Sequence, residues 1–163
     1  MRRRHSRPAT RLLLAIAAFS ILVMSGCATA ADAHNTSVAV TSTRIAGLGD
    51  VVTDADGKTV YMFVPDHRHR VTCSALCQGT WPPLTAPAGD KPLAGSGARS
   101  GLLGTDPNPF GGPPVVTYNG WPLYTYVGDV RPATAAGQGI DLNGGLWYVL
   151  NPAGRVVRRS TVR

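Results

Sequence analysis

The 163-residue sequence contains no glutamate, and charged residues of all kinds make up only 15% of it. Because Glu favours the exposed faces of helices, its absence argues against a protein built from long helices. The sequence is instead rich in turn-forming residues, with 19 Gly and 13 Pro. This composition is typical of short strands joined by many turns. We therefore predict a mainly β, antiparallel, hairpin-based domain with short helical turns.

The central part of the chain also lacks a basic cluster, although the net charge of the whole chain is +7. Five Arg lie before residue 12, and four more lie within residues 155–163. Residues 27–154 contain 7 Lys and Arg against 9 Asp. A nucleic-acid interface needs Lys and Arg gathered on the folded domain. We therefore expect no nucleic-acid partner.

A further absence is an apolar run of the ~20 residues that a transmembrane helix needs. Residues 12–24 form an uncharged apolar run of 13 residues after five Arg, a pattern typical of a signal peptide. The run ends in Met24-Ser25-Gly26-Cys27. Small residues directly before a Cys resemble a bacterial lipobox, although Met24 stands where Leu is usual. We predict a signal peptide over residues 1–26 and lipidation of Cys27, which would anchor the protein outside the cytoplasm to the bacterial cell membrane.

A second cleavage site is possible a few residues later. Ala28-Thr29-Ala30 fits the pattern of ordinary signal peptidase. Cleavage at Ala30 would remove Cys27 and release a soluble, secreted protein.

The rest of the chain divides into a tether, a domain and a tail. Residues 27–44 are predicted to be a lipidated tether, and residues 158–163 a basic tail. Between them, residues 45–157 are predicted to form a single β-rich domain of two related halves, about 45–88 and 113–157. Residues 85–114 are rich in Gly and Pro, which predicts a long surface connector between the halves.

Turn residues between β-branched runs predict three hairpins. The first spans residues 51–64 around Asp56-Gly57, and the second spans residues 115–127 around Asn119-Gly120. The third spans residues 146–157 around a turn at 151–154. Partial alternation over residues 37–45 predicts a first strand before them.

A short motif occurs twice, as Tyr61-Met62-Phe63-Val64-Pro65-Asp66 and as Tyr124-Thr125-Tyr126-Val127-Gly128-Asp129. In both copies the Tyr follows the turn Gly of a predicted hairpin by four residues, which indicates an internal repeat rather than a chance match. A Trp follows each copy, Trp81 after the first and Trp147 after the second. Alternation along the first copy leaves apolar side chains on both faces of the strand, so we expect both faces to be covered.

The motif residues allow a functional and a structural interpretation. The aromatic side chains could form a platform on which a ligand stacks, or they could pack across the sheet. Asp66 and Asp129 could be a catalytic carboxylate pair, or each could cap the turn after its strand by accepting backbone N–H bonds. We expect packing and capping, because paired aromatic residues on a strand and Asp at an element boundary are ordinary. The aromatic set is Tyr61, Phe63, Tyr124 and Tyr126.

The chain has three Cys, and lipidation or removal of Cys27 leaves Cys73 and Cys77 as a pair. Their spacing places both thiols on one side of a helical turn, and outside the cytoplasm such a pair is expected to form a disulfide. The alternative is a Cu(I) or Zn site that also uses His67 and His69. We expect no metal there, since Arg68 lies between the two His and Arg70 follows them, and nearby cations disfavour a metal ion.

Taken together, these features resemble the bacterial lipoproteins described as a secreted repeat of unknown function, which share a Tyr-x-[Phe/Trp/Tyr]-x-x-Asp motif. The matching pieces cover about residues 45–157. The resemblance implies export, and often lipidation, but no activity. Besides the two motif copies they are Cys73 and Cys77 with Trp81-Pro82-Pro83, Tyr118-Asn119-Gly120, Gly137-Gln138-Gly139 and Trp147-Tyr148.

The sequence therefore predicts an exported envelope lipoprotein with a structural or binding role, and contains none of the common hydrolase, metalloprotease or nucleotide-binding motifs. We expect a non-enzymatic protein without a cofactor, whose partners are the membrane, through its anchor, and an envelope protein or small ligand. The alternative is a thiol-redox or copper-handling envelope protein that uses Cys73 and Cys77.

Overall fold

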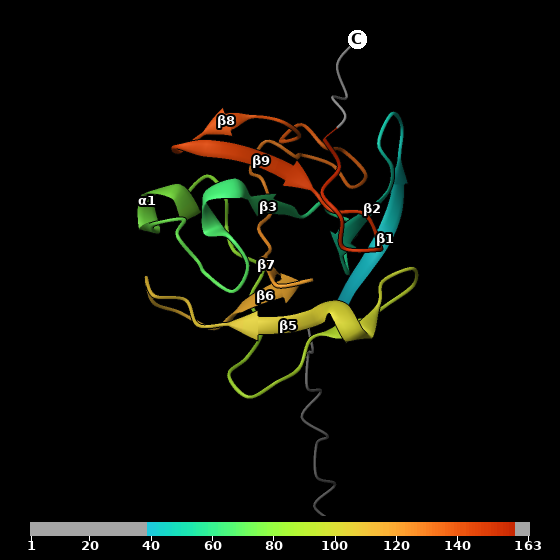
Figure 1. Cartoon of the computed structure of the whole chain (residues 1–163). Helices are drawn as coiled ribbons and strands as arrows, with labels where there is room; N and C mark the ends of the chain where they lie inside the picture. Colours follow the sequence, from blue (N-terminus) through green and yellow to red (C-terminus); the bar gives the residue numbers. More distant parts are fainter. Residues whose placement is uncertain (1–38, 159–163) are drawn as a thin grey trace, which may run out of the picture. The chain divides into compact units, whose positions relative to one another are not determined.

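The computed structural model describes residues 39–158, which belong to one compact unit of the chain (Figure 1). The predicted signal peptide, Cys27 with its predicted lipidation, the predicted tether up to residue 38 and the predicted tail from residue 159 lie outside the described residues. Within the described part of the chain, no helix has the length and apolar character needed to cross a membrane.

Short strands form three sheets of three strands each, as predicted for a mainly β protein. The sheets have the strand orders β2-β1-β4, β3-β9-β8 and β5-β6-β7, and only the β1–β4 pair is parallel. The first sheet consists of β1 (Ala39–Ile45), β2 (Gly49–Asp54) and β4 (Leu93–Ala94). The second consists of β3 (Tyr61–Phe63), β8 (Asp141–Leu142) and β9 (Gly145–Val149). The third consists of β5 (Leu103–Asp106), β6 (Val115–Tyr118) and β7 (Trp121–Pro122).

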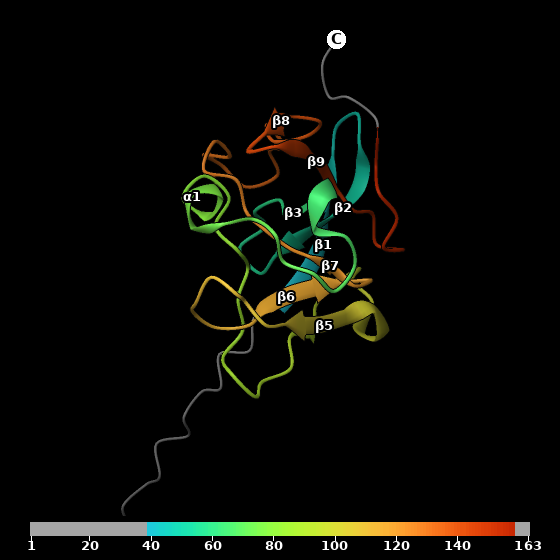
Figure 2. The same cartoon turned by 60° about the vertical axis from the view of Figure 1, so that its left-hand side comes forward.

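The helical segments are short, as the composition predicts. They are the 3-10 turns η1 (Val64–Asp66) and η2 (Ser100–Leu102) and the single-turn helix α1 (Ala75–Gln78). Figures 1 and 2 both place α1 at the edge of the domain, away from β1 and β2.

The second predicted hairpin is confirmed. Tyr118 pairs with Trp121 and Thr117 with Pro122. Asn119 and Gly120 have φ angles of 51° and 77°, the positive values that a two-residue hairpin turn requires. Pro122 lies in β7, which is an edge strand, as expected for a residue that cannot donate to a ladder.

The first predicted hairpin is only partly present. Its turn exists, because Asp54 Oδ1 accepts hydrogen bonds from the backbone N–H groups of Asp56 and Lys58. Beyond the isolated bridge between Thr53 and Thr59, however, β2 pairs along its whole length with β1, and β3 pairs with the distant β9. The strands are assigned correctly, but alternation does not distinguish a neighbouring partner from one 84 to 88 positions away in the chain.

Residues 85–114, which the sequence predicts to be a long surface connector, contain regular structure as well. This segment contains β4, η2 and β5, and all four residues of β5 pair with β6. The sequence of β5 hides the strand because it includes Gly104, a weak strand former. The close approach of β6 accounts for the Gly, since a Cβ at this position would lie 3.0 Å from Thr117 Oγ1.

Two hydrophobic clusters lie on opposite faces of β3, as the alternation of apolar residues predicts. Tyr61 and Phe63 belong to one cluster, and Val60 and Met62 belong to the other. In the third predicted hairpin, Leu150 and Val156 pair as an isolated bridge. Both residues pack in the second cluster, with Val60 and Met62. Residues 60–63 are all 3% exposed or less, so this strand is the centre of the fold.

Candidate functional site

The two motif copies lie side by side, although 63 positions separate them in the chain. The backbone N–H of Tyr61 donates to Tyr124 O (2.8 Å), and the N–H of Tyr124 donates to Tyr61 O (3.0 Å). Tyr61 pairs with Tyr124 as an antiparallel bridge, which brings the two repeats into contact at their motif residues.

The side chains of the motif are exchanged between the repeats. The Tyr61 hydroxyl donates to Asp129 Oδ2 (2.6 Å), and the Tyr124 hydroxyl donates to Asp66 Oδ2 (2.6 Å). Each Tyr therefore bonds the Asp of the other copy and not its own. The Asp residues are 0% and 6% exposed and both Tyr are 0% exposed, so both bonds are excluded from solvent.

The second oxygen of each Asp closes the loop that follows its strand. Asp66 Oδ1 accepts from the backbone N–H groups of Thr72 (2.7 Å) and Cys73 (3.2 Å). Asp129 Oδ1 accepts from the N–H of Ala136 (2.7 Å), which occupies the same place relative to its Asp as Cys73 does. The expected backbone capping is thus present, but it holds a loop of about seven residues rather than the adjacent turn.

The aromatic residues of both repeats form one stack of four rings. The indoles of Trp81 and Trp147 lie parallel, 3.9 Å apart between ring centres. Phe63 stacks on Trp147 at 4.2 Å, and Tyr126 stacks on Trp81 at 4.3 Å, so again each motif aromatic contacts the Trp of the other repeat. Such pairs contribute about 0.5–1.5 kcal/mol each beyond the area that they bury.

The two motif Tyr complete this core by edge contacts within their own repeats. Tyr61 lies edge-on to Trp81 at 5.4 Å, and Tyr124 lies edge-on to Trp147 at 5.3 Å. The motif aromatics therefore share one core, in which only Tyr126 is partly exposed.

Burial controls the ionisation of the four polar motif groups. Burial raises the pKa of Asp66 and Asp129, while the hydroxyl and N–H donors around each carboxylate oppose this shift. Burial and the neighbouring carboxylate also raise the pKa of the Tyr61 and Tyr124 hydroxyls far above its ordinary value. Each Tyr is therefore kept protonated as a donor, and each Asp oxygen is occupied as an acceptor.

A family model described as a secreted repeat of unknown function matches residues 42–85 and 110–151, one match for each motif copy. The chain belongs to this family. The structure shows how two secreted repeats make one domain, by exchanging Tyr–Asp bonds and ring stacks between the copies. No curated protein and no solved structure matches the chain.

The first secreted repeat contains the predicted disulfide between Cys73 and Cys77, with a Cα–Cα distance of 5.3 Å. It spans the start of α1, and both Cys are buried, at 1% and 4% exposure. The N–H of Cys73 is one of the donors to Asp66, so the disulfide loop is fixed to the Tyr–Asp core. The second secreted repeat reaches the same arrangement with Ala136 in place of a Cys.

His67 and His69, the two His of the proposed metal alternative, are both exposed. His69 Nδ1 lies 3.3 Å from Asp106 Oδ1, while His67 and His69 both have positive φ angles, 54° and 60°. Within residues 39–158, no group of three or more His, Cys, Asp or Glu is placed to hold a metal ion.

Two residues that the sequence did not single out make contacts here: Gly137 in the motif core, and Asp106 beside His69. Gly137 donates its N–H to the Tyr61 hydroxyl (3.2 Å), and a Cβ at this position would lie 2.8 Å from the Trp81 ring. Its only signal was its place in Gly137-Gln138-Gly139. Asp106 has no sequence signal, because it lies within residues 85–114, which the composition predicts to be a connector.

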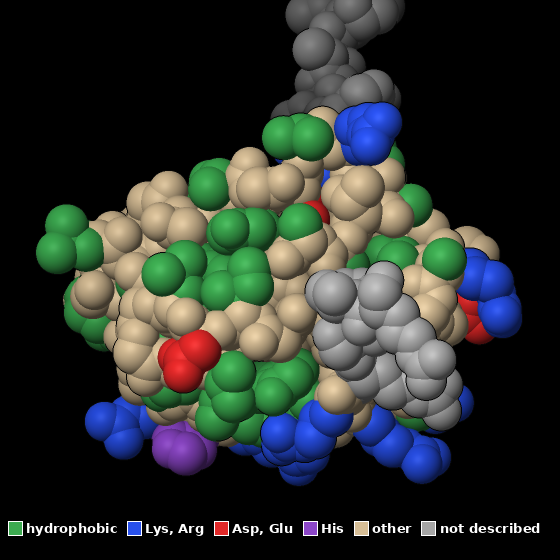
Figure 3. Space-filling model, turned by 90° about the horizontal axis from the view of Figure 1, so that it is seen from above, with side chains coloured by type: hydrophobic (Ala, Val, Ile, Leu, Met, Phe, Trp, Pro, Cys, Tyr) green, Lys and Arg blue, Asp and Glu red, His purple; other side chains and the backbone are tan. Residues whose placement is uncertain are grey.

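The exposed surface is more basic than the count of charges predicts. Residues 39–158 contain 9 Lys and Arg and 8 Asp, but Asp54, Asp66 and Asp129 are buried. Figure 3 accordingly shows more Lys and Arg than Asp on the face it presents.

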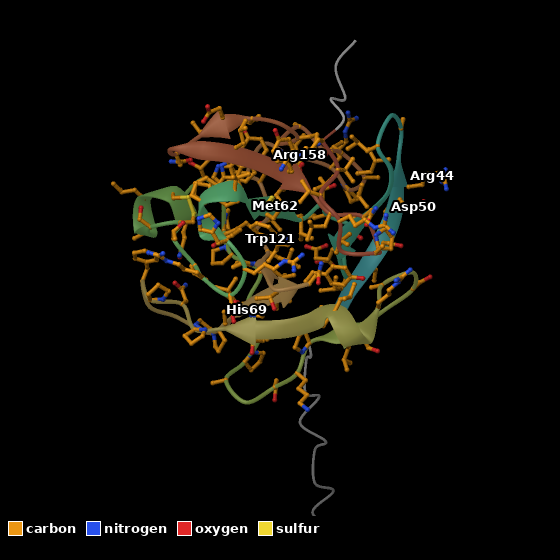
Figure 4. The ribbon with its side chains drawn as sticks, viewed as in Figure 1. Arg44, Asp50, Met62, His69, Trp121 and Arg158 are labelled. Atoms are coloured by element: carbon orange, nitrogen blue, oxygen red, sulfur yellow. A yellow bond between two sulfur atoms is a disulfide. The ribbon has the colours of Figure 1, made fainter. Side chains whose placement is uncertain are left out.

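Two open grooves lie outside the motif core. The larger, of about 530 Å³, is lined by apolar residues such as Leu48 and Val156 and by charged residues, among them Arg99, Arg158 and Asp50. Figure 4 shows Arg158 beside β9 and Asp50 beside β2. The smaller groove, of about 270 Å³, is lined by Arg68, His69 and Asn119 together with backbone of β5 and the β6–β7 turn. No residue of either motif copy lines either groove.

Proposed function

We propose that the protein is a non-enzymatic, lipid-anchored module of the bacterial cell envelope, in which Cys27 carries the anchor and the two-repeat domain presents a binding surface. One observation carries this proposal. All four polar groups of the repeated motif are used inside the core, in bonds between the repeats, so the motif is an architectural device.

Further support comes from the location and the surface of the domain. The family is described as secreted, and a disulfide is at home in an oxidising compartment. The larger groove is lined by Arg99, Arg158 and apolar residues, and its Asp50 is paired with Arg44. This lining suits a small ligand or a segment of an envelope protein that carries negative charge.

The anchor is tested by labelling growing cells with a clickable palmitate analogue. We expect label on the wild-type protein and none on Cys27→Ser. The double variant Cys73→Ser/Cys77→Ser is the matched control and should keep its label. A wild-type protein that exports without label, with an N-terminus beyond Ala30, would refute the anchor and leave the soluble, secreted form.

The architectural role of the motif is tested by replacing its carboxylates. Asp66→Asn and Asp129→Asn should each lower the melting temperature, because a buried amide presents donors where the core supplies only donors. An accessible catalytic carboxylate would behave differently, since its replacement leaves stability unchanged or raises it. Unchanged melting in both variants would argue for a catalytic pair.

The thiol-redox or copper-handling alternative is decided on the same exported protein. If Cys73 and Cys77 are reactive, mild reduction of the native protein should release thiols that a thiol reagent detects. The reduced protein should then also bind Cu(I). The burial of both sulfur-bearing residues favours an inert disulfide.

A further inference from the structure

Three large apolar side chains project from separate segments of the domain without joining the core. Leu76 in α1 is 89% exposed, Val127 within the second motif copy is 58% exposed, and Phe110 between β5 and β6 is 44% exposed. Isolated exposed apolar residues are common on soluble proteins. Three of them at one place require an explanation.

Hydrogen bonds hold these three segments together. Asn108 Oδ1 accepts from Gln78 Nε2 (3.2 Å) at the end of α1 and from the N–H of Phe110 (3.1 Å). The N–H of Val127 donates to Thr80 O (3.2 Å), just beyond α1. Figures 1 and 2 show α1 and the loop between β5 and β6 on the same side of the domain in both views.

Basic residues occupy the loop between η1 and α1, which reaches the end of β5 through His69. His69 contacts Asp106, which precedes Phe110 by four residues, and Arg68 and Arg70 flank His69. Both Arg are exposed, and neither forms an ion pair with another residue of the described chain. Asp106 is turned inward, with 13% of its side chain exposed.

Arg68 and His69 also line the smaller groove, together with Asn119 and with Leu102 and Leu103 at the junction of η2 and β5. Figure 4 shows His69 at the end of β5. The basic loop thus borders a recess beside the β6–β7 turn whose cationic lining suits an anionic group.

We propose that this end, defined by Leu76, Phe110, Val127, Arg68 and Arg70 and called here the docking end, lies on the surface of a bilayer that contains anionic phospholipid. Apolar tips that enter the boundary of the acyl chains, beside cations that meet the head groups, form the pattern by which peripheral proteins bind such surfaces. The apolar side chains of the docking end project outward, so the surface of a bilayer fits them better than a protein segment does.

This inference deepens the proposed function, because the anchor at Cys27 brings the domain to the membrane but does not orient it. Residues 28–38 could extend at most about 40 Å, so a tether of this length leaves several faces free to meet the bilayer. The docking end selects one of them.

The test measures which side chain enters the bilayer. The exported chain is mixed with vesicles of phosphatidylcholine alone or with phosphatidylglycerol, both containing lipids brominated along the acyl chain. Tryptophan is introduced as Leu76→Trp or Phe110→Trp. Leu93→Trp is the matched control, since Leu93 is a 56% exposed apolar residue in β4, in another sheet. The native Trp signal is measured on the wild type and subtracted.

We expect bromine to quench Trp at 76 and 110, but not at 93, in the vesicles that contain phosphatidylglycerol. Arg68→Gln and Arg70→Gln should each lower the ratio of docked to undocked protein about fivefold, and high salt should do the same. Lys91→Gln is the control for charge and should leave the ratio unchanged.

Sedimentation of the vesicles separates this proposal from the anchor. In one outcome the protein sediments with both vesicle types, but no introduced Trp is quenched more than in the wild type. This result supports the anchor and overturns the docking end. Equal quenching at 76, 110 and 93 overturns it as well. Protein that remains in the supernatant with phosphatidylcholine, yet is quenched at 110 with phosphatidylglycerol, supports the docking end and refutes the anchor. A dimer that Phe110→Ser dissociates, without quenching, would assign this end to a second copy of the chain instead.

Discussion

The exchange of Tyr–Asp bonds between the repeats makes a quantitative prediction for double-mutant cycles. Tyr124→Phe removes the hydroxyl that bonds Asp66 at 2.6 Å and leaves a fully buried carboxylate oxygen without this donor. Leaving such a group unsatisfied costs about 1–3 kcal/mol. Tyr61→Phe should cost more, because the Tyr61 hydroxyl also accepts the N–H of Gly137. Urea unfolding with an unchanged m-value measures both losses.

The pairing itself is tested by combining each Tyr variant with each Asp variant. Tyr124→Phe with Asp66→Asn, and Tyr61→Phe with Asp129→Asn, should show coupling energies of about 0.5–3 kcal/mol, since each pair shares a bond. The pairs within one motif copy, such as Tyr61→Phe with Asp66→Asn, should be additive within about 0.5 kcal/mol.

A matched control exists in the second motif copy. The Tyr126 hydroxyl forms no hydrogen bond to the described residues, while its ring stacks on Trp81, so Tyr126→Phe should change stability by less than about 0.5 kcal/mol. Coupling that is stronger within each motif copy than between the copies would refute the exchange. Additivity of all four combinations would show that the hydroxyls and carboxylates do not depend on one another.

Three further predictions concern the same core. Tyr61 and Tyr124 stay protonated in the folded state, so the unfolded state binds fewer protons than the folded state above pH ~10. The free energy of unfolding should therefore fall there by about 1.4 kcal/mol per pH unit for each Tyr. Unfolding followed by circular dichroism at several pH values measures this slope, which the variant Tyr61→Phe/Tyr124→Phe should remove. Gly137→Ala should destabilise by about 1–3 kcal/mol in urea unfolding, because the added methyl meets the indole of the first repeat, and a neutral result would contradict this close packing. Replacing Cys73 and Cys77 by Ala should cost about 2 kcal/mol, the loop entropy of so short a ring, and a melting temperature equal to wild type would show that the disulfide adds nothing.

The local features of this protein could be predicted because their causes lie within a few residues. Asn119-Gly120 forms the expected turn since these residues tolerate positive φ, and Cys73 and Cys77 form the expected disulfide since one helical turn separates them. The two-sided burial of residues 60–63 followed from alternation alone, as did the division into two repeats from the recurrence of the motif.

The sequence also produced two wrong or incomplete assignments, and both involve distant partners. The strand at residues 103–106 was missed because Gly104 lowers its local preference, while its pairing with β6 supplies the stability. The sequence predicts that β3 pairs with the strand just before it in the chain, β2. In the structure β3 pairs instead with β9, a strand of the other repeat. In both places tertiary contact overrides local preference.

The role of the motif residues was likewise decided by tertiary structure. The sequence determined that two Tyr, two Asp and their accompanying rings recur at fixed spacing, which indicates equivalent positions in two similar units. It could not determine that each Tyr bonds the Asp of the other unit, because that choice depends on how the two units pack. The packing places both Tyr backbones in register, and this geometry makes the motif the buried joint between the repeats.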